Sequence, residues 1–245
     1  MCFRTWVQPA PRKVVRRIGN AEEPDAMRRS PTLRDMQRSE RQAARRQSLL
    51  EAAGKAASRH GAARLRLKDV ADAAGVTPAS ILYHFENGID AVLSELYREM
   101  TGRFCEKRRA IVDAVDEPVD QLAAAIREGV PKGPDDNEAV LLWQMDAFVG
   151  SGPLYDVLGT QSFEEQASVY ERICAVGEAR GDFELAAHPR DVGRVLVALE
   201  DGLGRQVIGI NSGLDREKAL QIISQVASLL VGAAVQLEDR SPEAD

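Results

Sequence analysis

Side chains that can exchange hydrogen bonds with a nucleic acid are concentrated in one short stretch of the sequence. Two basic residues, Arg66 and Lys68, open it, and hydroxyl, phenol and imidazole groups follow at Ser80, Tyr83 and His84. Lys and Arg commonly meet phosphate oxygens, whereas short polar and aromatic side chains can also reach base edges and thymine methyl groups. This grouping favours recognition of DNA over a chemical reaction.

Groups able to support catalysis or to bind a metal are scattered along the chain. None of the histidines and cysteines share metal-ligand spacing, and no serine-nucleophile, phosphate-loop or dinucleotide motif occurs in the sequence. An odd, dispersed set of cysteines indicates a reducing compartment, and no apolar run is long enough to span a bilayer. We therefore expect a cytoplasmic protein that is not an enzyme and has no metal and no cofactor. The residues concerned are His60, His84, His188, Cys2, Cys105 and Cys174.

Two short helices around a tight turn are predicted to position the polar stretch. Apolar residues recur at helical spacing before Gly75, whose permissive backbone suits a helix end and a sharp reversal. Thr77 is a good N-cap for the second helix, and Pro78 suits its first turn because the missing N–H costs nothing there. This is the build of a helix-turn-helix, whose second helix enters the major groove. Its predicted inward face comprises Ile81, Leu82 and Phe85.

Several motifs occur together around this turn. They are LLEAA at 49–53, Gly61, DVADAAGV at 69–76 and ILYHF at 81–85. With these motifs, the segment 45–93 resembles the DNA-binding domain of TetR-type transcriptional regulators. A later run, RGDFE followed by LVALEDGLG within residues 180–204, resembles the penultimate helix region of the same family. The sequence departs from the family pattern, which commonly has an aromatic residue, Thr, Tyr and Lys near Ala57, Arg66, Leu82 and Gly88 respectively.

Charge is distributed unevenly, although the chain as a whole carries a net charge of -6. Residues 1–47 hold twelve Lys and Arg against five Asp and Glu, and the remainder is acidic. A basic N-terminal part suits contact with phosphates, while a merely solvated tail remains an alternative. Residues 1–38 contain four prolines among charges without a sustained period, so we expect a disordered extension there. Met27 is a possible alternative start.

The remaining pattern is helical throughout, which predicts an all-α fold. A helix over 39–60 should support the helix-turn-helix, and a fourth helix capped by Asn87 should link it to a larger domain. Gly- and Pro-containing breaks separate the later helices. These are predicted at 118–130, 137–149, 154–180, 189–210 and 215–238. The resulting domains are a DNA-binding domain at 39–88, a helical effector-binding and dimerisation domain at 89–238, and a disordered tail at 239–245.

Ten residues are predicted to contact DNA. Ser80 and Tyr83 are the candidates for base edges or methyl groups, and the others are expected to meet phosphate or to shape the approach. The full set is Arg45, Arg46, Arg66, Lys68, Thr77, Pro78, Ala79, Ser80, Tyr83 and His84.

The last two helices carry more apolar side chains than one partner helix would cover, which favours a homodimer; burial inside the monomer is the alternative. The predicted interface residues are Leu196, Leu199, Leu203, Val207, Ile223, Val226 and Leu230. Aromatic residues in the middle of the chain are candidates for an effector cavity or for plain core. They are Trp143, Phe148, Tyr155, Phe163 and Tyr170, together with Met145.

The resemblance implies a sequence-specific regulator that binds a double-stranded DNA operator. Within this resemblance, the best-fitting function is that of a repressor released from a palindromic operator by a small-molecule effector. The segment 143–155 contains few basic residues, which favours an apolar or weakly cationic effector. The alternatives are a helical protein-interaction scaffold and a ligand-independent DNA-binding regulator.

Overall fold

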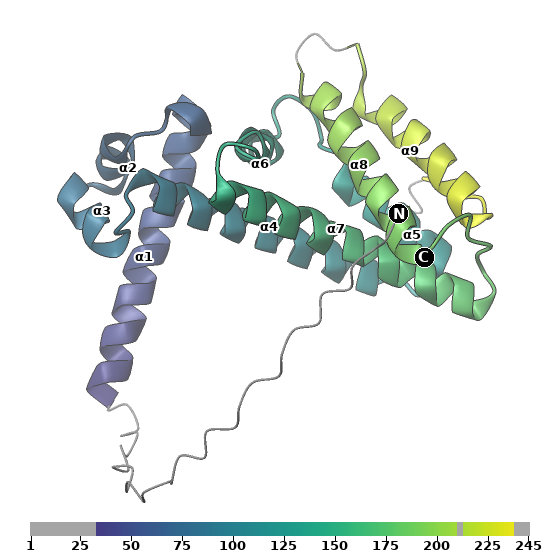
Figure 1. The fold of residues 1–245 in the computed structure, drawn as a ribbon, viewed down its shortest axis with the longest axis horizontal. Helices are drawn as coiled ribbons and strands as arrows, with labels where there is room; N and C mark the ends of the chain where they lie inside the picture. The colour runs from purple at the N-terminus through teal and green to yellow at the C-terminus, as the bar shows by residue number, and fades with distance from the viewer. Residues whose placement is uncertain (1–32, 210–212, 238–245) are drawn as a thin grey trace, which may run out of the picture. The chain divides into compact units, whose positions relative to one another are not determined.

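Helices account for all the regular secondary structure in residues 33–209 and 213–237, the ranges described by this computed structural model (Figure 1). Within these ranges there is no strand, and the prediction of an all-α fold is confirmed. The N-terminal extension up to residue 32 and the tail at 239–245 lie outside the described residues. In chain order the helices are α1 (Leu33–His60), the 3-10 helix η1 (Ala62–Arg64), α2 (Leu67–Ala74), α3 (Pro78–His84), α4 (Ile89–Asp113), α5 (Pro118–Gly129), α6 (Asn137–Asp146), α7 (Pro153–Arg180), α8 (Pro189–Ile208) and α9 (Arg216–Val231).

Several helix ends differ from the sequence prediction, most of all the start of α1 and the end of α9. The first helix begins at Leu33, six residues earlier than expected, because nothing in 33–38 breaks the helix. The N-cap of α4 is Gly88, with φ 66°, instead of Asn87. The last helix stops at Val231 because Gly232 adopts the left-handed conformation (φ 68°), and the chain after it no longer continues the helical ladder.

Two hydrophobic cores hold the described chain together. The first core lies between helices α1, α2, α3 and α4. It includes Leu49, Val70, Ile81 and Phe85, each almost fully buried. Leu141 of α6 belongs to this core as well, so a helix of the larger domain completes the packing of the small one. The second core joins α4, α5, α7, α8 and α9. No described helix is long and apolar enough to cross a membrane.

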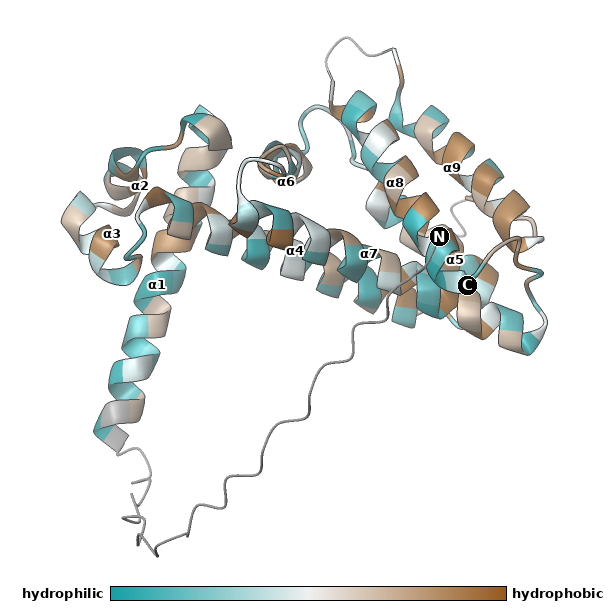
Figure 2. Cartoon of the chain, in the orientation of Figure 1, coloured by the Kyte–Doolittle hydropathy of each residue, from teal (hydrophilic) through white to brown (hydrophobic). Residues whose placement is uncertain are grey.

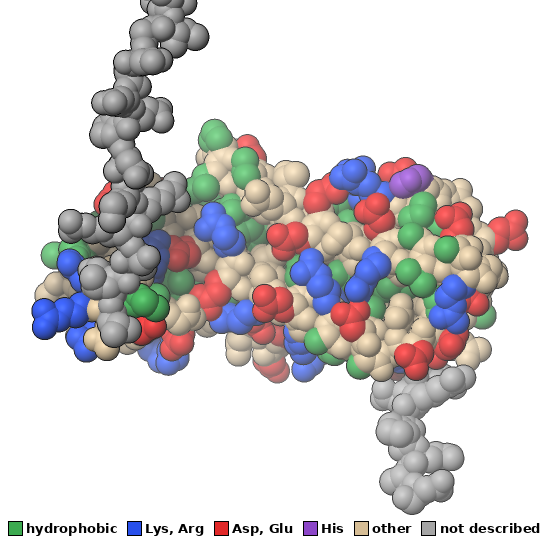
Figure 3. Space-filling view, turned by 90° about the horizontal axis from the view of Figure 1, so that it is seen from below, with side chains coloured by type: hydrophobic (Ala, Val, Ile, Leu, Met, Phe, Trp, Pro, Cys, Tyr) green, Lys and Arg blue, Asp and Glu red, His purple; other side chains and the backbone are tan. Residues whose placement is uncertain are grey.

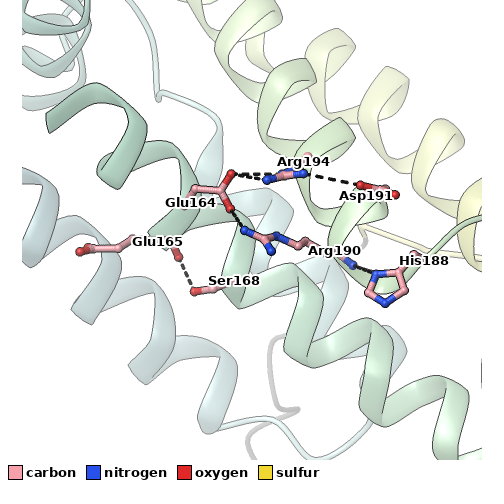
Figure 4. Close-up of polar contacts among 7 residues, drawn as sticks. All are labelled: Glu164, Glu165, Ser168, His188, Arg190, Asp191 and Arg194. Atoms are coloured by element: carbon pink, nitrogen blue, oxygen red, sulfur yellow. Dashed lines mark hydrogen bonds and ion pairs between the residues drawn. The ribbon is translucent and has the colours of Figure 1, made fainter. Parts of the chain in front are cut away.

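Close packing and ion pairs fix α7 against α8. A Cβ added to Gly193 would lie 2.6 Å from the carbonyl oxygen of Ala167, so only glycine allows this approach. At the surface, the Glu164 carboxylate accepts hydrogen bonds from Arg190 (2.9 Å) and Arg194 (2.7 Å), as Figure 4 shows. These two guanidinium groups lower the pKa of Glu164. In the same view, His188 caps α8 by accepting a hydrogen bond at Nδ1 from the Arg190 N–H.

Candidate functional site

The turn between α2 and α3 has the geometry that its residues predict. Gly75 is left-handed, with φ 64° and ψ 37°, and its N–H bonds back to the end of α2. Thr77 caps α3, since its Oγ1 accepts a hydrogen bond from the Ser80 N–H at 3.3 Å. Pro78 occupies the first turn, and Ile81 anchors α3 in the core with no exposed surface. The helix therefore offers its N-terminal side chains to solvent on a rigid support.

Most residues predicted to contact DNA lie on the surface of this domain. Exposed members are Arg45, Arg66, Lys68, Thr77, Pro78, Ala79 and Tyr83, while Ser80 and His84 are half-buried. Tyr83 is the most exposed of the described Phe, Tyr and Trp side chains, at 69%, and its ring meets His84 edge-on, with 5.1 Å between the ring centres. Leu82 was predicted to face inward but is 43% exposed, because Ile81 and Phe85 alone fill the core side of this short helix. In Figure 3, Lys and Arg side chains gather around this domain, whereas acidic and basic side chains intermingle elsewhere on that face.

Arg46 has partners inside the protein. Its guanidinium donates hydrogen bonds to both carboxylate oxygens of Glu95 on α4 and to the backbone oxygen of His84 at the end of α3. It also lies over the Phe85 ring, 4.3 Å from the ring centre. The hydrogen bond to Glu95 raises the pKa of Arg46. Arg46 thus ties α1, α3 and α4 together, whereas its neighbour Arg45 is exposed.

A cavity of about 460 Å³ opens among α4, α5, α6, α7 and α8 of the larger domain, and the first residue of α9, Arg216, also lines it. Its walls mix apolar surface with charged side chains of both signs, so the cavity is more polar than most sites that bind small molecules. Apolar lining comes from Phe104, Val130, Leu142, Trp143 and Ile208, and polar lining includes Thr101, Asp146, Ser162, Gln166, Glu200, Asp201 and Arg205.

One of the six predicted effector residues, Trp143, lines this cavity. Met145 and Phe148 pack into the core of the small domain, and Phe163 packs against the core of the larger one. The Tyr155 ring contacts the Phe148 ring, and its hydroxyl donates a hydrogen bond of 3.2 Å to Asp90. Burial, and to a smaller extent the charge of Asp90, raises the pKa of Tyr155 to about 12. These four, like Tyr170, do not line the cavity.

Tyr170 belongs to a buried charge cluster behind the cavity wall. Arg108 has no exposed surface and donates hydrogen bonds to Glu200 Oε1 (2.5 Å) and to the backbone oxygen of Ala125 (3.0 Å). The Tyr170 hydroxyl donates to the same Glu200 oxygen. Burial raises the pKa of Glu200, and the Arg108 charge and the Tyr170 hydrogen bond oppose that rise. A Cβ on Gly129 would collide with the Glu200 carboxylate, so glycine makes the room that this group occupies.

Two further carboxyl groups line the cavity near Glu200. Asp201 is an exposed residue of α8 that lines the cavity. Burial and the charges of Asp146 and Glu200 raise the pKa of Asp201 to about 7, against smaller opposing effects of Arg108 and Arg205. Burial also raises the pKa of Asp146, opposed by a hydrogen bond from the Tyr97 hydroxyl and by Arg205. Within the described ranges, no three such side chains converge as metal ligands.

Comparison with known proteins identifies the small domain. Residues 49–96 match the sequence model of the bacterial regulatory proteins of the tetR family. These residues form a TetR-family DNA-binding domain. The predicted resemblance of this segment is therefore confirmed. The search of curated proteins found no match to the sequence.

Solved structures share the fold over most of the chain. A TetR-family regulator from Rhodococcus sp. is 20% identical, with a TM-score of 0.63 over 76% of this chain and 98% of that one. A regulator from Saccharomonospora viridis in complex with choline is 21% identical, with a TM-score of 0.67 over 76% and 96%. FadR from Bacillus subtilis in complex with stearoyl-CoA is 17% identical, with a TM-score of 0.61 over 76% and 97%. These likenesses show that the fold is shared over about three quarters of the chain.

In this TetR fold, α6 contacts both the cavity and the DNA-binding domain. Leu142 and Trp143 face the cavity, whereas Leu141 and Met145 are buried in the core of the small domain. Gln144 Oε1 accepts a hydrogen bond of 2.9 Å from the Ala62 N–H in η1. Any displacement of α6 by a ligand would therefore act directly on the support of the helix-turn-helix.

The predicted dimer residues fall into two groups. Leu196, Val207 and Ile223 are buried in the core of the larger domain, so they are not available to a partner, and the alternative of burial inside the monomer holds for them. Leu199, Leu203, Val226 and Leu230 are half-buried. Sequence reasoning missed the two most exposed aliphatic side chains of this region, Val195 (43%) on α8 and Leu229 (79%) on α9. Figure 2 shows hydrophobic residues along α9.

Glu200, Asp201 and Arg205 were missed as cavity residues. Glu200 lies four residues after Leu196, at a position where the apolar period of α8 calls for a core side chain. A charge at a core position was the available signal, because buried charges require partners.

Proposed function

We propose that this regulator is a repressor that binds an inverted-repeat operator as a homodimer and is released by a small molecule held in the cavity. The single observation that carries the proposal is α6, which supplies one wall of the cavity and packs with its other side against the DNA-binding domain. A ligand that prefers one position of α6 would shift the population of DNA-competent dimers, since a ligand moves an equilibrium by its differential affinity for the two states. The choline and stearoyl-CoA bound by two structural neighbours support the use of this fold for ligands of different chemistry.

At the DNA, Ser80 and Tyr83 are proposed to read base edges or methyl groups in the major groove. Thr77, His84, Lys68, Arg66 and Arg45 would meet phosphates, with Pro78 and Ala79 shaping the approach. Arg46 has a supporting role in this proposal, because its donors already bind Glu95 and His84.

The proposed dimer uses the surface of α8 and α9, where Val195, Leu199, Val226 and Leu229 retain exposure. Two copies of the recognition helix would then enter major grooves about 34 to 36 Å apart, or a multiple of that spacing.

Footprinting of the purified protein on DNA flanking its gene tests the proposal. We expect protection of one inverted repeat at physiological salt, and a fall in operator affinity of roughly 5- to 150-fold when an effector binds, the range of a coupling of about 1 to 3 kcal/mol. A preferred site whose affinity no bound ligand alters would leave a ligand-independent regulator. Without any preferred site, the regulatory proposal fails.

A further inference from the structure

The exposed face of α3 is apolar. Four of the seven residues of this helix are exposed, and they are Pro78, Ala79, Leu82 and Tyr83. Their spacings of three and four residues place them on one face, while Ile81 on the opposite side is fully buried. Exposed apolar faces commonly mark interaction sites, so this face fits a partner that also presents carbon groups.

Side chains that read bases by paired hydrogen bonds are absent from α3. Arg and Lys pair with guanine, Asn and Gln pair with adenine, and Asp and Glu accept from cytosine. None of these six residue types occurs in α3, whose sequence is PASILYH. Its polar groups are the half-buried side chains of Ser80 and His84 and the hydroxyl of Tyr83. This helix therefore offers a base single hydrogen bonds, and most of its exposed surface offers none.

Positive charge for the DNA backbone comes from outside α3. Arg66, which caps α2, and Lys68, in its first turn, are both exposed. Contacts of basic side chains with phosphates position a protein on DNA and carry no sequence information directly. Recognition of the base sequence therefore depends on the apolar face of α3.

Neighbouring groups support the two largest side chains of this face. The Tyr83 ring meets the His84 ring edge-on, with 5.1 Å between the ring centres and 87° between the ring planes. Leu82 Cδ2 lies 3.8 Å from the position that a Cβ on Gly88 would take, which is an ordinary van der Waals distance. Side chains that are already held lose less conformational freedom on binding, which favours recognition by shape.

The matching group on DNA is the 5-methyl group of thymine. Base pairs display this group in the major groove, where apolar side chains recognise it. Burial of a carbon group of this size strengthens binding about fourfold. Several such contacts multiply into a clear preference for one sequence.

We propose that α3 reads the operator through thymine methyl groups, which contact Ala79, Leu82 and the ring of Tyr83. The hydroxyl of Tyr83 has no part in base discrimination. This inference rests on the proposed function in taking α3 as the helix that enters the major groove, and it adds the chemical feature of the operator that is read.

The first test removes single methyl groups from the DNA. Once footprinting has defined the operator, each thymine of a protected half-site is replaced in turn by deoxyuridine, which lacks only the 5-methyl group. We expect the affinity, measured by fluorescence anisotropy, to fall about fourfold at each contacted position. Replacement of thymines outside the protected region is the control and should leave the affinity unchanged. Unchanged affinity at every protected thymine overturns the inference.

A second substitution in the DNA separates the methyl group from the rest of the base. At a sensitive position, exchange of thymine–adenine for cytosine–guanine should weaken binding, and 5-methylcytosine at that position should restore most of the loss. If 5-methylcytosine binds no better than cytosine, recognition depends on the hydrogen-bonding groups of the base and the inference fails.

Protein variants assign the contacts to side chains. Tyr83→Ala and Leu82→Ala should each abolish the preference for thymine over uracil at one position, whereas Tyr83→Phe keeps the ring and should retain that preference. Val157→Ala, which shortens an exposed apolar side chain of α7, is the matched control and should change neither the affinity nor the preference. With folding verified by circular dichroism, a loss in Tyr83→Phe as large as that in Tyr83→Ala assigns recognition to the hydroxyl and contradicts the inference.

The outcomes distinguish this inference from the proposed function. A preferred inverted repeat whose affinity does not depend on thymine methyl groups leaves the operator-binding proposal in place and overturns the methyl readout. Without any preferred site, both fail.

Discussion

The hydrogen bond between α6 and η1 should matter for both stability and signalling. Gln144→Ala removes the oxygen that accepts the Ala62 N–H, and Ala62 is only 1% exposed. Its N–H would lose a partner in a place that water reaches poorly. Leaving a buried donor unsatisfied costs about 1 to 3 kcal/mol, so the free energy of unfolding should fall by that amount.

Thermal and denaturant unfolding measure this change. In a chain of this size, each kcal/mol lowers the melting temperature by about 2 to 4 °C, so Gln144→Ala should melt about 2 to 12 °C below the parent protein. If α6 transmits the ligand signal, the same variant should also show a smaller loss of operator affinity on effector binding, measured by fluorescence anisotropy with labelled operator DNA.

Two controls separate the hydrogen bond from the loss of a side chain. Gln161→Ala removes an exposed glutamine from α7 and should change stability by less than about 0.5 kcal/mol. Gln144→Glu keeps an acceptor oxygen and should recover most of the stability. The reasoning is refuted if Gln144→Ala is as stable as Gln161→Ala, because the Ala62 N–H would then have another partner.

Four more outcomes follow from the geometry. Arg46→Ala should destabilise the protein by about 1 to 3 kcal/mol in urea unfolding, because the part-buried Glu95 carboxylate and the His84 carbonyl lose their charged donor; unfolding at the parent midpoint would contradict the supporting role. Lys68→Ala should leave stability unchanged, weaken binding to all DNA sequences alike and reduce the salt slope by about one, as titrations at several salt concentrations will show. Leu229→Asp should convert a dimer into monomers in sedimentation without unfolding the subunit, since the side chain is 79% exposed; a dimer of undiminished stability would place the interface elsewhere. The pKa of Asp201 is raised from 3.8 to about 7 in the folded protein, so ionisation of this group lowers the free energy of unfolding progressively as the pH rises between these values. Asp201→Asn should therefore have the same free energy of unfolding as the parent near pH 4, and a value about 1 kcal/mol higher at pH 8 once solvent screening is allowed for. If the difference between variant and parent is the same at both pH values, the raised pKa is contradicted.

Local residue chemistry was sufficient to predict the helix-turn-helix. Gly75, Thr77 and Pro78 each act through their own backbone or through a neighbour within three residues, so the turn could be derived without the rest of the chain. The long helices and their breaks follow from apolar periodicity in the same way. Errors at helix ends arose where one residue decides the end, as Gly232 does for α9.

Tertiary structure decided which side chains are free to act. Arg45 and Arg46 are equivalent in the sequence, but Arg46 meets Glu95, which lies 49 residues further along the chain. Likewise, an apolar period on α8 and α9 predicts a buried face without saying whether it is covered by the subunit or by a partner. Leu196 and Ile223 face the subunit core, while Leu229 faces outward.

The sequence by itself determined an all-α chain with a DNA-binding turn, because helix periodicity, caps and turns are short-range effects. The cavity was decided by the tertiary structure alone, since its walls come from six helices, α4 to α9, and from the segment between α5 and α6. The raised pKa values of Glu200 and Asp201 depend on burial and on neighbours such as Arg108 and Asp146, which are brought close only by folding. Electrostatic interactions depend on distance in space, and that distance is what the packing of α4, α6 and α8 sets.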